Sequence, residues 1–241
     1  MAPVLLTSGD RRLEALLARG WSLPAEEHPL GRLQGRKLGA FRVLTLLGPK
    51  NGVGARYFQL FLADGQGRLS DEPIVLGLHN SGRFPGYNWI DLIRYPGAAV
   101  FGAKTLDLAT EGLDRGLFRL LSELVPPGGH LMVEYESPSQ RESERILGLG
   151  YPPIATPLGQ LLFQAGCRSF RDWYIAEGGR EGPRKLQGFK PADESVARAK
   201  TEALRRDLSE LLSRPPVSKH GEWERTAHRL TRAALRTLDP E

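Results

Sequence analysis

Short apolar runs separated by turn-forming residues dominate the first half of the chain. The runs cover residues 41–47 (FRVLTLL), 56–63 (RYFQLFLA), 73–78 (PIVLGL) and 88–95 (NWIDLIRY), with Gly, Asn, Asp and Pro between them. Their length and their aromatic and β-branched content are typical of strands. Parallel neighbours would each need a crossover of about a dozen residues or more, and no helical pattern separates these runs. The pattern therefore predicts an antiparallel meander.

Helical periodicity appears in the second half of the chain. The expected order after the meander is a helix at 114–124, a strand at 130–135, a helix at 157–166, and a hairpin of strands 170–176 and 184–189. Pro-Pro-Gly-Gly ends the first of these helices, and Gly166 ends the second. Another short amphipathic helix is expected at 10–19, ended by Gly20.

Residues 191–241 have a different pattern from the rest. Two amphipathic segments flank Arg214-Pro215-Pro216, and Asp193 is a suitable N-cap for the first. This pattern predicts an α/β domain at 1–190 and a C-terminal helical hairpin at 191–241. We expect the hairpin to cap the core. A homodimer element is the alternative.

Composition is that of an ordinary soluble globular protein. The chain has 241 residues, 40% of them apolar and 25% charged, and its one cysteine excludes an internal disulfide framework. No apolar run approaches the ~20 residues of a membrane span, and the first residues lack a signal-peptide pattern. We therefore expect a cytoplasmic protein without a membrane partner. The preference for Arg over Lys hints at a thermophilic source.

The net charge of +5 is concentrated in residues 11–56 and 168–190. Such a surface favours anionic partners, including phosphate-bearing cofactors, although a solvated basic surface explains it equally well. No nucleic-acid-binding motif is present, so nucleic acid is not an expected partner. The five histidines show no metal-ligand spacing, and Cys167 is expected to be a small core residue.

The stretch VPPGGHLMVEY (125–135) is the kind of helix-to-strand junction found in S-adenosylmethionine-dependent methyltransferases. Those enzymes need a doubly wound parallel sheet. If residues 41–47 were its first strand, about 40 residues would remain for two strands and three helices, where each strand–helix unit takes roughly 20–30. The spacing therefore favours a mostly antiparallel α+β (α/β) sheet with flanking helices.

The order meander, helix, strand, helix and hairpin resembles the GNAT acyltransferase superfamily. The stretch PLGQLLFQAGCRSFRDWY (157–174) is similar to that superfamily's helix ending in Gly-Phe before a strand, with Cys167 in place of Phe. NSGRFPGYNWIDL, PPGGHLMVEYE and DWYIAEGGREGPRKLQGFKP also resemble an uncharacterised family of archaeal and thermophilic-bacterial proteins, known as a domain of unknown function. The resemblance covers roughly residues 41–191.

The GNAT resemblance implies that acyl-coenzyme A lies between the strand at 88–95 and the strand at 130–135. The superfamily's phosphate loop, Arg/Gln-x-x-Gly-x-Gly/Ala, would precede the helix at 114–124. The loop at 96–116 lacks that spacing, and its candidate cofactor-binding residues are Gly102, Lys104 and Thr105, with Arg115 as a further countercharge. A plain connection is the alternative, because glycine-rich loops alone are weak evidence.

Two stretches carry candidate chemistry. In HNSGRFPGYNW (79–89), Arg83, Tyr87 and Asn88 are candidates for substrate binding, and His79 for a general base. The alternative is a hairpin whose aromatic residues fill the core. In VEYES (133–137), Glu134 could deprotonate an amine and Tyr135 could protonate a leaving thiolate, or both could be an exposed strand end.

Three functions are left open by the sequence. The leading hypothesis is transfer of an acyl group from acyl-coenzyme A to a small-molecule or peptide amine. The alternatives are a methyltransferase and a non-catalytic binding module that kept the fold and lost the cofactor loop.

Overall fold

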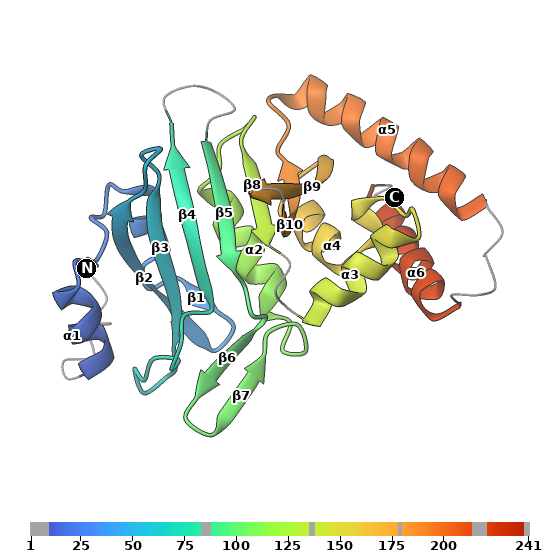
Figure 1. Cartoon of the computed structure of the whole chain (residues 1–241). Coiled ribbons are helices and arrows are strands. Elements are labelled where there is room, and N and C mark those ends of the chain that lie inside the picture. Colours follow the sequence, from blue (N-terminus) through green and yellow to red (C-terminus); the bar gives the residue numbers. More distant parts are fainter. Residues whose placement is uncertain (1–9, 83–87, 135–137, 178–179, 214–220, 239–241) are drawn as a thin grey trace.

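One mixed sheet organises the molecule (Figure 1). The computed structural model describes residues 10–82, 88–134, 138–177, 180–213 and 221–238. The strands are β1 (Lys37–Leu38), β2 (Phe41–Lys50), β3 (Arg56–Ala63), β4 (Val75–Ser81), β5 (Asn88–Arg94), β6 (Ala98–Phe101), β7 (Lys104–Asp107), β8 (His130–Glu134), β9 (Ser169–Glu177) and β10 (Arg180–Phe189). The helices are α1 (Arg11–Ala18), α2 (Leu113–Glu123), α3 (Pro138–Gly148), α4 (Pro157–Gln164), α5 (Glu194–Ser213) and α6 (Gly221–Leu238), with 3-10 helices η1 (Pro29–Leu33) and η2 (Pro153–Ala155).

The strand order in the main sheet is β1-β2-β3-β4-β5-β8-β10-β9, and β6 and β7 form a separate hairpin. Neighbours are antiparallel except β5 and β8, which run parallel from the pair Trp89–His130 to the pair Leu92–Val133. Their pairing stops before β5 ends at Arg94. The predicted mixed, mostly antiparallel sheet with flanking helices is confirmed.

The two faces of the sheet bury different clusters. The α2 face carries Ile90, Leu92 and Val133, which pack in the main core with apolar side chains of α2 and α4. The opposite face, here the α1 face, buries a smaller cluster that includes Leu46 against Leu13 of α1. Because side chains alternate along a strand, each strand residue is assigned to one face by its register. This assignment decides which polar side chains can meet.

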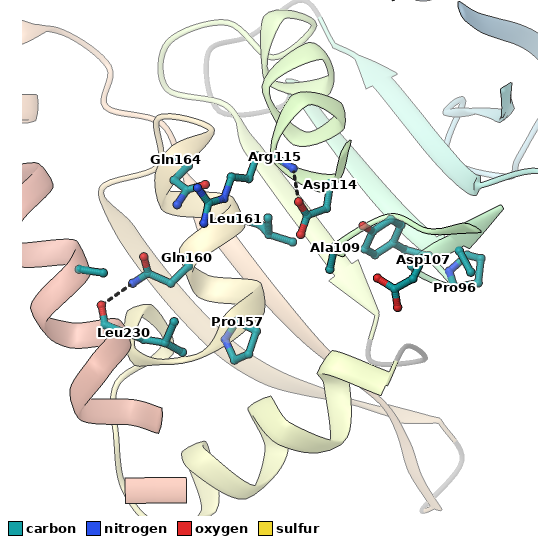
Figure 2. Close-up of a pocket in the computed structure, with 14 residues that line it drawn as sticks. Pro96, Asp107, Ala109, Asp114, Arg115, Pro157, Gln160, Leu161, Gln164 and Leu230 are labelled. Atoms are coloured by element: carbon teal, nitrogen blue, oxygen red, sulfur yellow. Dashed lines mark hydrogen bonds between the residues drawn. The ribbon is translucent and has the colours of Figure 1, made fainter. Parts of the chain in front are cut away.

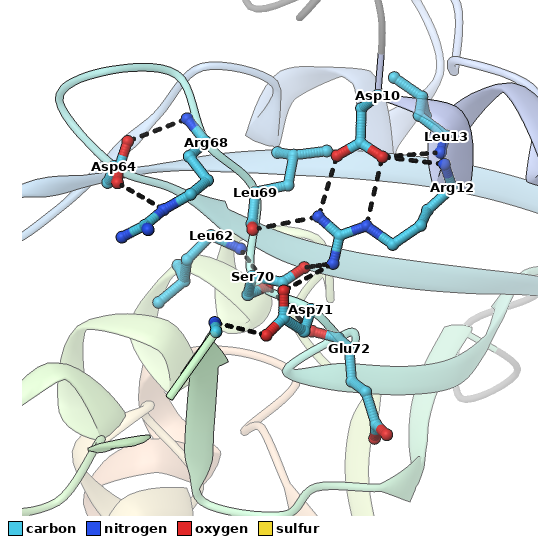
Figure 3. A network of polar contacts seen from close by, with 11 residues as sticks. Asp10, Arg12, Leu13, Leu62, Asp64, Arg68, Leu69, Ser70, Asp71 and Glu72 are labelled. Atoms are coloured by element: carbon cyan, nitrogen blue, oxygen red, sulfur yellow. Dashed lines mark hydrogen bonds and ion pairs between the residues drawn. The ribbon is translucent and has the colours of Figure 1, made fainter. Parts of the chain in front are cut away.

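A network of hydrogen bonds and ion pairs at the surface connects α1 to the rest of the molecule (Figure 3). Asp10 caps α1 by accepting hydrogen bonds from the amides of Arg12 and Leu13. The Arg12 guanidinium joins Asp10 to Asp71, at 3.0 Å and 2.8 Å. Asp71 in turn accepts a hydrogen bond from the Gly102 amide at 2.6 Å. One arginine therefore links the first helix to the turn of the β6–β7 hairpin.

Several predicted boundaries were wrong, for identifiable reasons. Strand β2 continues through Gly48-Pro49. The pairing with β3 is irregular between Leu47 and Lys50, so Pro49 does not have to donate a backbone hydrogen bond to the neighbouring strand. The β6–β7 hairpin occupies part of a stretch expected to be a loop, since its strands are too short for periodicity to reveal. Helix α3 was also missed, because its sequence PSQRESERILG has few apolar residues.

The C-terminal helices form the expected hairpin. Asp193 accepts a hydrogen bond from the Val196 amide at 2.9 Å, as an N-cap does. Leu208 of α5 and Ala234 of α6 share a buried cluster with Phe163 of α4. The helical hairpin therefore rests on α4, to the right of the sheet in Figure 1.

Helix α4 lies unusually close to η2, and Gly159 allows this. A Cβ atom at Gly159 would stand 1.8 Å from the Pro153 carbonyl oxygen. We expect Gly159→Ala to lower the free energy of unfolding by about 1–3 kcal/mol, the usual cost of overpacking. Urea denaturation measures the change.

The matched control is Gly148→Ala at the end of α3, where a Cβ would meet nothing within 4 Å. This substitution should be neutral or slightly stabilising, by up to about 1 kcal/mol. Equal stabilities for the two variants would show that the close approach of α4 to η2 does not matter.

Candidate functional site

A pocket opens beyond the carboxyl end of β5 (Figure 2). Its volume is about 300 Å³, at the lower end of the range for ligand sites. Six elements contribute to it: the end of β5, the start of β6, the end of β7, the first turn of α2, and the facing sides of α4 and α6. In open sheets, ligands commonly bind outside the carboxyl ends of strands, where neighbouring connections diverge.

The walls of the pocket are mostly apolar, and its charges are few. Among the described residues, three charged side chains line it: the carboxylates of Asp107 and Asp114 and the guanidinium of Arg115. Asp114 is half-buried, whereas Asp107 and Arg115 are exposed. Burial raises the pKa of Asp114; the Arg115 amide and charge oppose this, and the negative charge of Asp107 adds to it. The carboxylates therefore outnumber the cation.

Tyr95 adds a buried hydroxyl to this pocket. The side chain is 2% exposed, and its ring stacks edge-on against Phe118 of α2, with centroids 5.4 Å apart. Among the described residues, no hydrogen-bond partner is found for the hydroxyl, although the residue lines the pocket. Burial raises the pKa of Tyr95, and the charges of Asp114 and Asp107 raise it further. The hydroxyl and both carboxylates thus share one electrostatic environment.

The first turn of α2 does not present free amides to a phosphate. The Leu113 and Asp114 amides donate to the Leu108 carbonyl at 2.8 Å and 3.2 Å. The Arg115 amide donates to the Asp114 carboxylate at 2.6 Å. A phosphate cradle at a helix N-terminus requires such amides to point at the anion. With two carboxylates beside them, these residues do not fit the phosphates of coenzyme A.

A second polar feature lies in the middle of the sheet, on the α1 face. The Lys185 Nζ atom of β10 is 2.5 Å from Asp91 Oδ2 on β5 and 2.7 Å from Glu134 Oε1 on β8. All three side chains are buried. The other Asp91 oxygen, Oδ1, is buried without a hydrogen-bond partner among the described residues. This carboxylate–lysine cluster therefore bridges three neighbouring strands, β5, β8 and β10.

Opposing effects set the pKa values in the carboxylate–lysine cluster. Burial raises the pKa of Asp91 more than Lys185 lowers it. Burial alone would lower the pKa of Lys185, but the hydrogen bonds and charges of Asp91 and Glu134 outweigh it and raise the value. One ammonium thus serves two carboxylates, and Lys185 is held in its charged form.

The structure separates the two residues predicted to act as bases, Glu134 and His79. Glu134 belongs to the carboxylate–lysine cluster on the α1 face. His79 pairs with Ile90 across β4 and β5, which places it on the α2 face, 5.8 Å from the His28 ring. The sheet therefore lies between Glu134 and His79. Tyr135 lies outside the described residues.

Of the predicted binding residues that the structure describes, Arg115 lines the pocket and the others lie elsewhere. Asn88 begins β5, at the strand end opposite to Tyr95, and Arg83 and Tyr87 lie outside the described residues. Gly102, Lys104 and Thr105 are exposed at the turn of the β6–β7 hairpin. The β7 residue that lines the pocket is Asp107, at the opposite end of the strand from Lys104.

The sequence did not predict Asp91, Tyr95 or the two pocket carboxylates as site residues. One signal was available: Asp91 interrupts an apolar strand, NWIDLIR, where a charge needs a partner. Its partner lies 94 residues away, which no local pattern reveals. Cys167, by contrast, is buried as expected, and burial raises the pKa of its thiol to about 12.

Comparison with protein families assigns the chain. A family model described as "Protein of unknown function (DUF1122)" matches residues 53–215. The chain belongs to the DUF1122 family. The matched region includes the carboxylate–lysine cluster and, apart from the α6 residues, the lining of the pocket. No curated protein matches the chain.

A solved structure shares the fold of this DUF1122 protein. It is described as a protein of unknown function, AQ1966, from Aquifex aeolicus VF5. The two chains are 22% identical with a TM-score of 0.59, and the match covers 95% of this chain and 98% of the other. At this identity the likeness shows the fold alone.

The described part of this DUF1122 chain contains neither a candidate membrane span nor a candidate metal site. Its described helices include none with the length and apolar character of a membrane span. Among the same residues, no group of three or more His, Cys, Asp or Glu side chains could hold a metal ion.

Proposed function

We propose that this chain is a small-molecule-binding domain and that the pocket beyond β5 is its ligand site. One observation carries the proposal: the Tyr95 hydroxyl faces a pocket of about 300 Å³ and has no hydrogen-bond partner among the described residues. A hydroxyl in a pocket that has no partner within the chain is usually satisfied by ligand or water. The apolar walls favour an organic ligand over water alone.

The fit of the pocket favours a binding module that lacks the phosphate-binding loop. The amides at the start of α2 are engaged within the chain, and carboxylates stand where an anion would have to lie. The methyltransferase alternative required a doubly wound parallel sheet, and β5–β8 is the one parallel pair among the described strands. The proposed binding function therefore requires neither acyl-coenzyme A nor S-adenosylmethionine.

Transfer of an acyl group to an amine is the second candidate, and a specific observation favours it. The strand order sets β5 beside β8 in parallel, and their pairing ends before the carboxyl end of β5. This arrangement is the one expected from the GNAT resemblance, with Glu134 at the end of β8 as the candidate base. This candidate keeps acyl-coenzyme A as donor but assigns its phosphates no contact at α2.

A stability assay with three compounds tests the two candidates. We expect 2-phenylethanol, a small neutral probe, to stabilise the protein by about 1.4 kcal/mol at ten times its Kd. The pocket-filling variant Ala233→Trp should lose this response, whereas Ala199→Trp, on an exposed part of α5 away from the pocket, should keep it. Acetyl-coenzyme A and S-adenosylmethionine should leave the stability unchanged.

The outcomes separate the candidates. A stabilising response to acetyl-coenzyme A, together with amine-dependent release of free thiol, would favour the acyltransferase. A probe response that persists in Ala233→Trp would place binding elsewhere and contradict the pocket assignment.

A further inference from the structure

The charge balance of the pocket is negative. The described charged residues in its lining are two carboxylates, Asp107 and Asp114, and one cation, Arg115. The lining therefore carries a net charge of −1 when all three are ionised. Arg115 is exposed, and solvent screens its charge more than that of the half-buried Asp114. A bound cation would neutralise the pocket, whereas a bound anion would add to the repulsion.

The lining also offers free hydrogen-bond acceptors, beside the donor groups of Arg115 and Gln164. Asp114 uses Oδ1 to accept from the Arg115 amide, and Asp107 uses Oδ1 to accept from the Thr110 amide at 2.7 Å. No described donor contacts the Oδ2 atom of either residue. The Tyr95 hydroxyl supplies a third acceptor, independent of the carboxylates and buried at the same pocket. An ammonium group has three donors, which these three acceptors could satisfy.

The remaining lining argues for an organic cation. Pro96, Pro157, Leu161 and Leu230 form apolar walls around the polar groups. A hydrated inorganic ion would leave these walls in contact with water, whereas a hydrocarbon body would cover them. Since no metal-binding cluster occurs among the described residues, an inorganic cation also lacks a ligand set.

We infer that the pocket binds a primary amine as its ammonium ion, with Asp114 and Asp107 as countercharges, the Tyr95 hydroxyl as an acceptor, and the apolar walls around the carbon skeleton. This inference rests on the proposed function, because it names the class of ligand that the same pocket takes. It also fits the second candidate, in which an amine is the acceptor.

Three probes of similar shape and different charge test the inference. They are phenethylamine, 2-phenylethanol and phenylacetate, titrated by calorimetry at pH 7.5. We expect phenethylamine to bind about tenfold or more tightly than 2-phenylethanol, because its hydrogen bonds are charge-assisted. Phenylacetate should show no binding.

Substitutions then identify the groups that select the charge. Asp114→Asn should remove most of the preference for phenethylamine and leave the affinity for 2-phenylethanol unchanged. Asp107→Asn, at the exposed mouth of the pocket, should reduce the preference without affecting folding. Tyr95→Phe should weaken the binding of phenethylamine, because it removes the hydroxyl acceptor. Glu111→Gln removes the same charge just before α2, outside the pocket lining, and should change neither affinity.

The results distinguish the inference from the proposed function. Equal affinities for phenethylamine and 2-phenylethanol, both lost in Ala233→Trp, would keep the ligand pocket and overturn the selection for a cation. Tighter binding of phenylacetate would also overturn it. Failure of all three probes to bind wild-type protein would contradict both the pocket assignment and the inference.

Discussion

Lys185→Met should lower the free energy of unfolding by about 3–5 kcal/mol, the typical cost of breaking a buried ion pair on one side. The wild-type ammonium lies 2.5 Å from Asp91 and 2.7 Å from Glu134, and the side chains of all three residues are buried. Methionine keeps much of the volume and removes the charge. The two buried carboxylates, on β5 and β8, would then lose the ammonium that contacts both in the wild type.

Equilibrium urea denaturation at pH 7.5 measures this loss. The matched control is Arg36→Met, because Arg36 pairs with Glu123 at 3.1 Å with both side chains 46% exposed. Exposed pairs contribute about 1 kcal/mol or less, so the control should remain near wild type. Similar losses in both variants would mean that the carboxylate–lysine cluster has no special role in stability.

The pH dependence of Lys185→Met provides a second readout. Without the ammonium, the pKa of Asp91 in the folded state should rise further above its value in the unfolded chain, because burial raises it and Lys185 is the group that lowers it in the wild type. A carboxyl group of this kind destabilises the fold as pH rises and it is forced to ionise. The deficit relative to wild type should therefore shrink at pH 5 and grow toward pH 8.

Local pattern was sufficient for most strands and helices, because their limits are encoded in neighbouring residues. Strand β3 has the predicted bounds, 56–63, since Asp64-Gly65 ends it, and Asp193 caps α5 as its position suggested. Helix α3 lacked such a signal. Among its side chains whose burial is described, Ile146 is the one fully buried apolar residue, so its apolar face is too narrow to be recognised from periodicity.

The pocket could not be predicted, because its residues are not neighbours in the sequence. Tyr95 ends an apolar strand, Asp114 begins α2, and Leu230 lies in α6, and only tertiary packing brings them together. The sequence reading placed the cofactor contacts at Gly102, Lys104 and Thr105 because they share a loop with glycines. That loop contains a hairpin, whose turn binds Asp71 instead.

The two polar features of the sheet have different consequences for the candidate functions. Glu134 already hydrogen-bonds Lys185, so a role as general base would require it to give up part of a buried ion cluster. The pocket carboxylates carry no such constraint. Ligand binding and fold stability should therefore respond to different substitutions: Asp114→Asn to the former, and Lys185→Met to the latter.

His79 should make the fold sensitive to mild acid, and His79→Leu should remove much of this sensitivity. The imidazole is 4% exposed, and burial, assisted by His28, lowers its pKa from 6.5 to about 4. The unfolded chain therefore takes up a proton before the folded protein does, and stability is lost as pH falls from about 6.5 through 4. The full separation corresponds to about 3 kcal/mol.

Urea denaturation of wild type and His79→Leu at pH 7.5, 5.5 and 4.5 isolates this contribution. The other histidines occur in both proteins, so their effects cancel in the difference, apart from that of His28, whose ring lies 5.8 Å from that of His79. Wild type should lose up to about 3 kcal/mol more than the variant between pH 7.5 and 4.5, because leucine has no proton to bind. Parallel losses would mean that His79 is charged in the folded state or is hydrated, and that the α2 face tolerates its imidazolium.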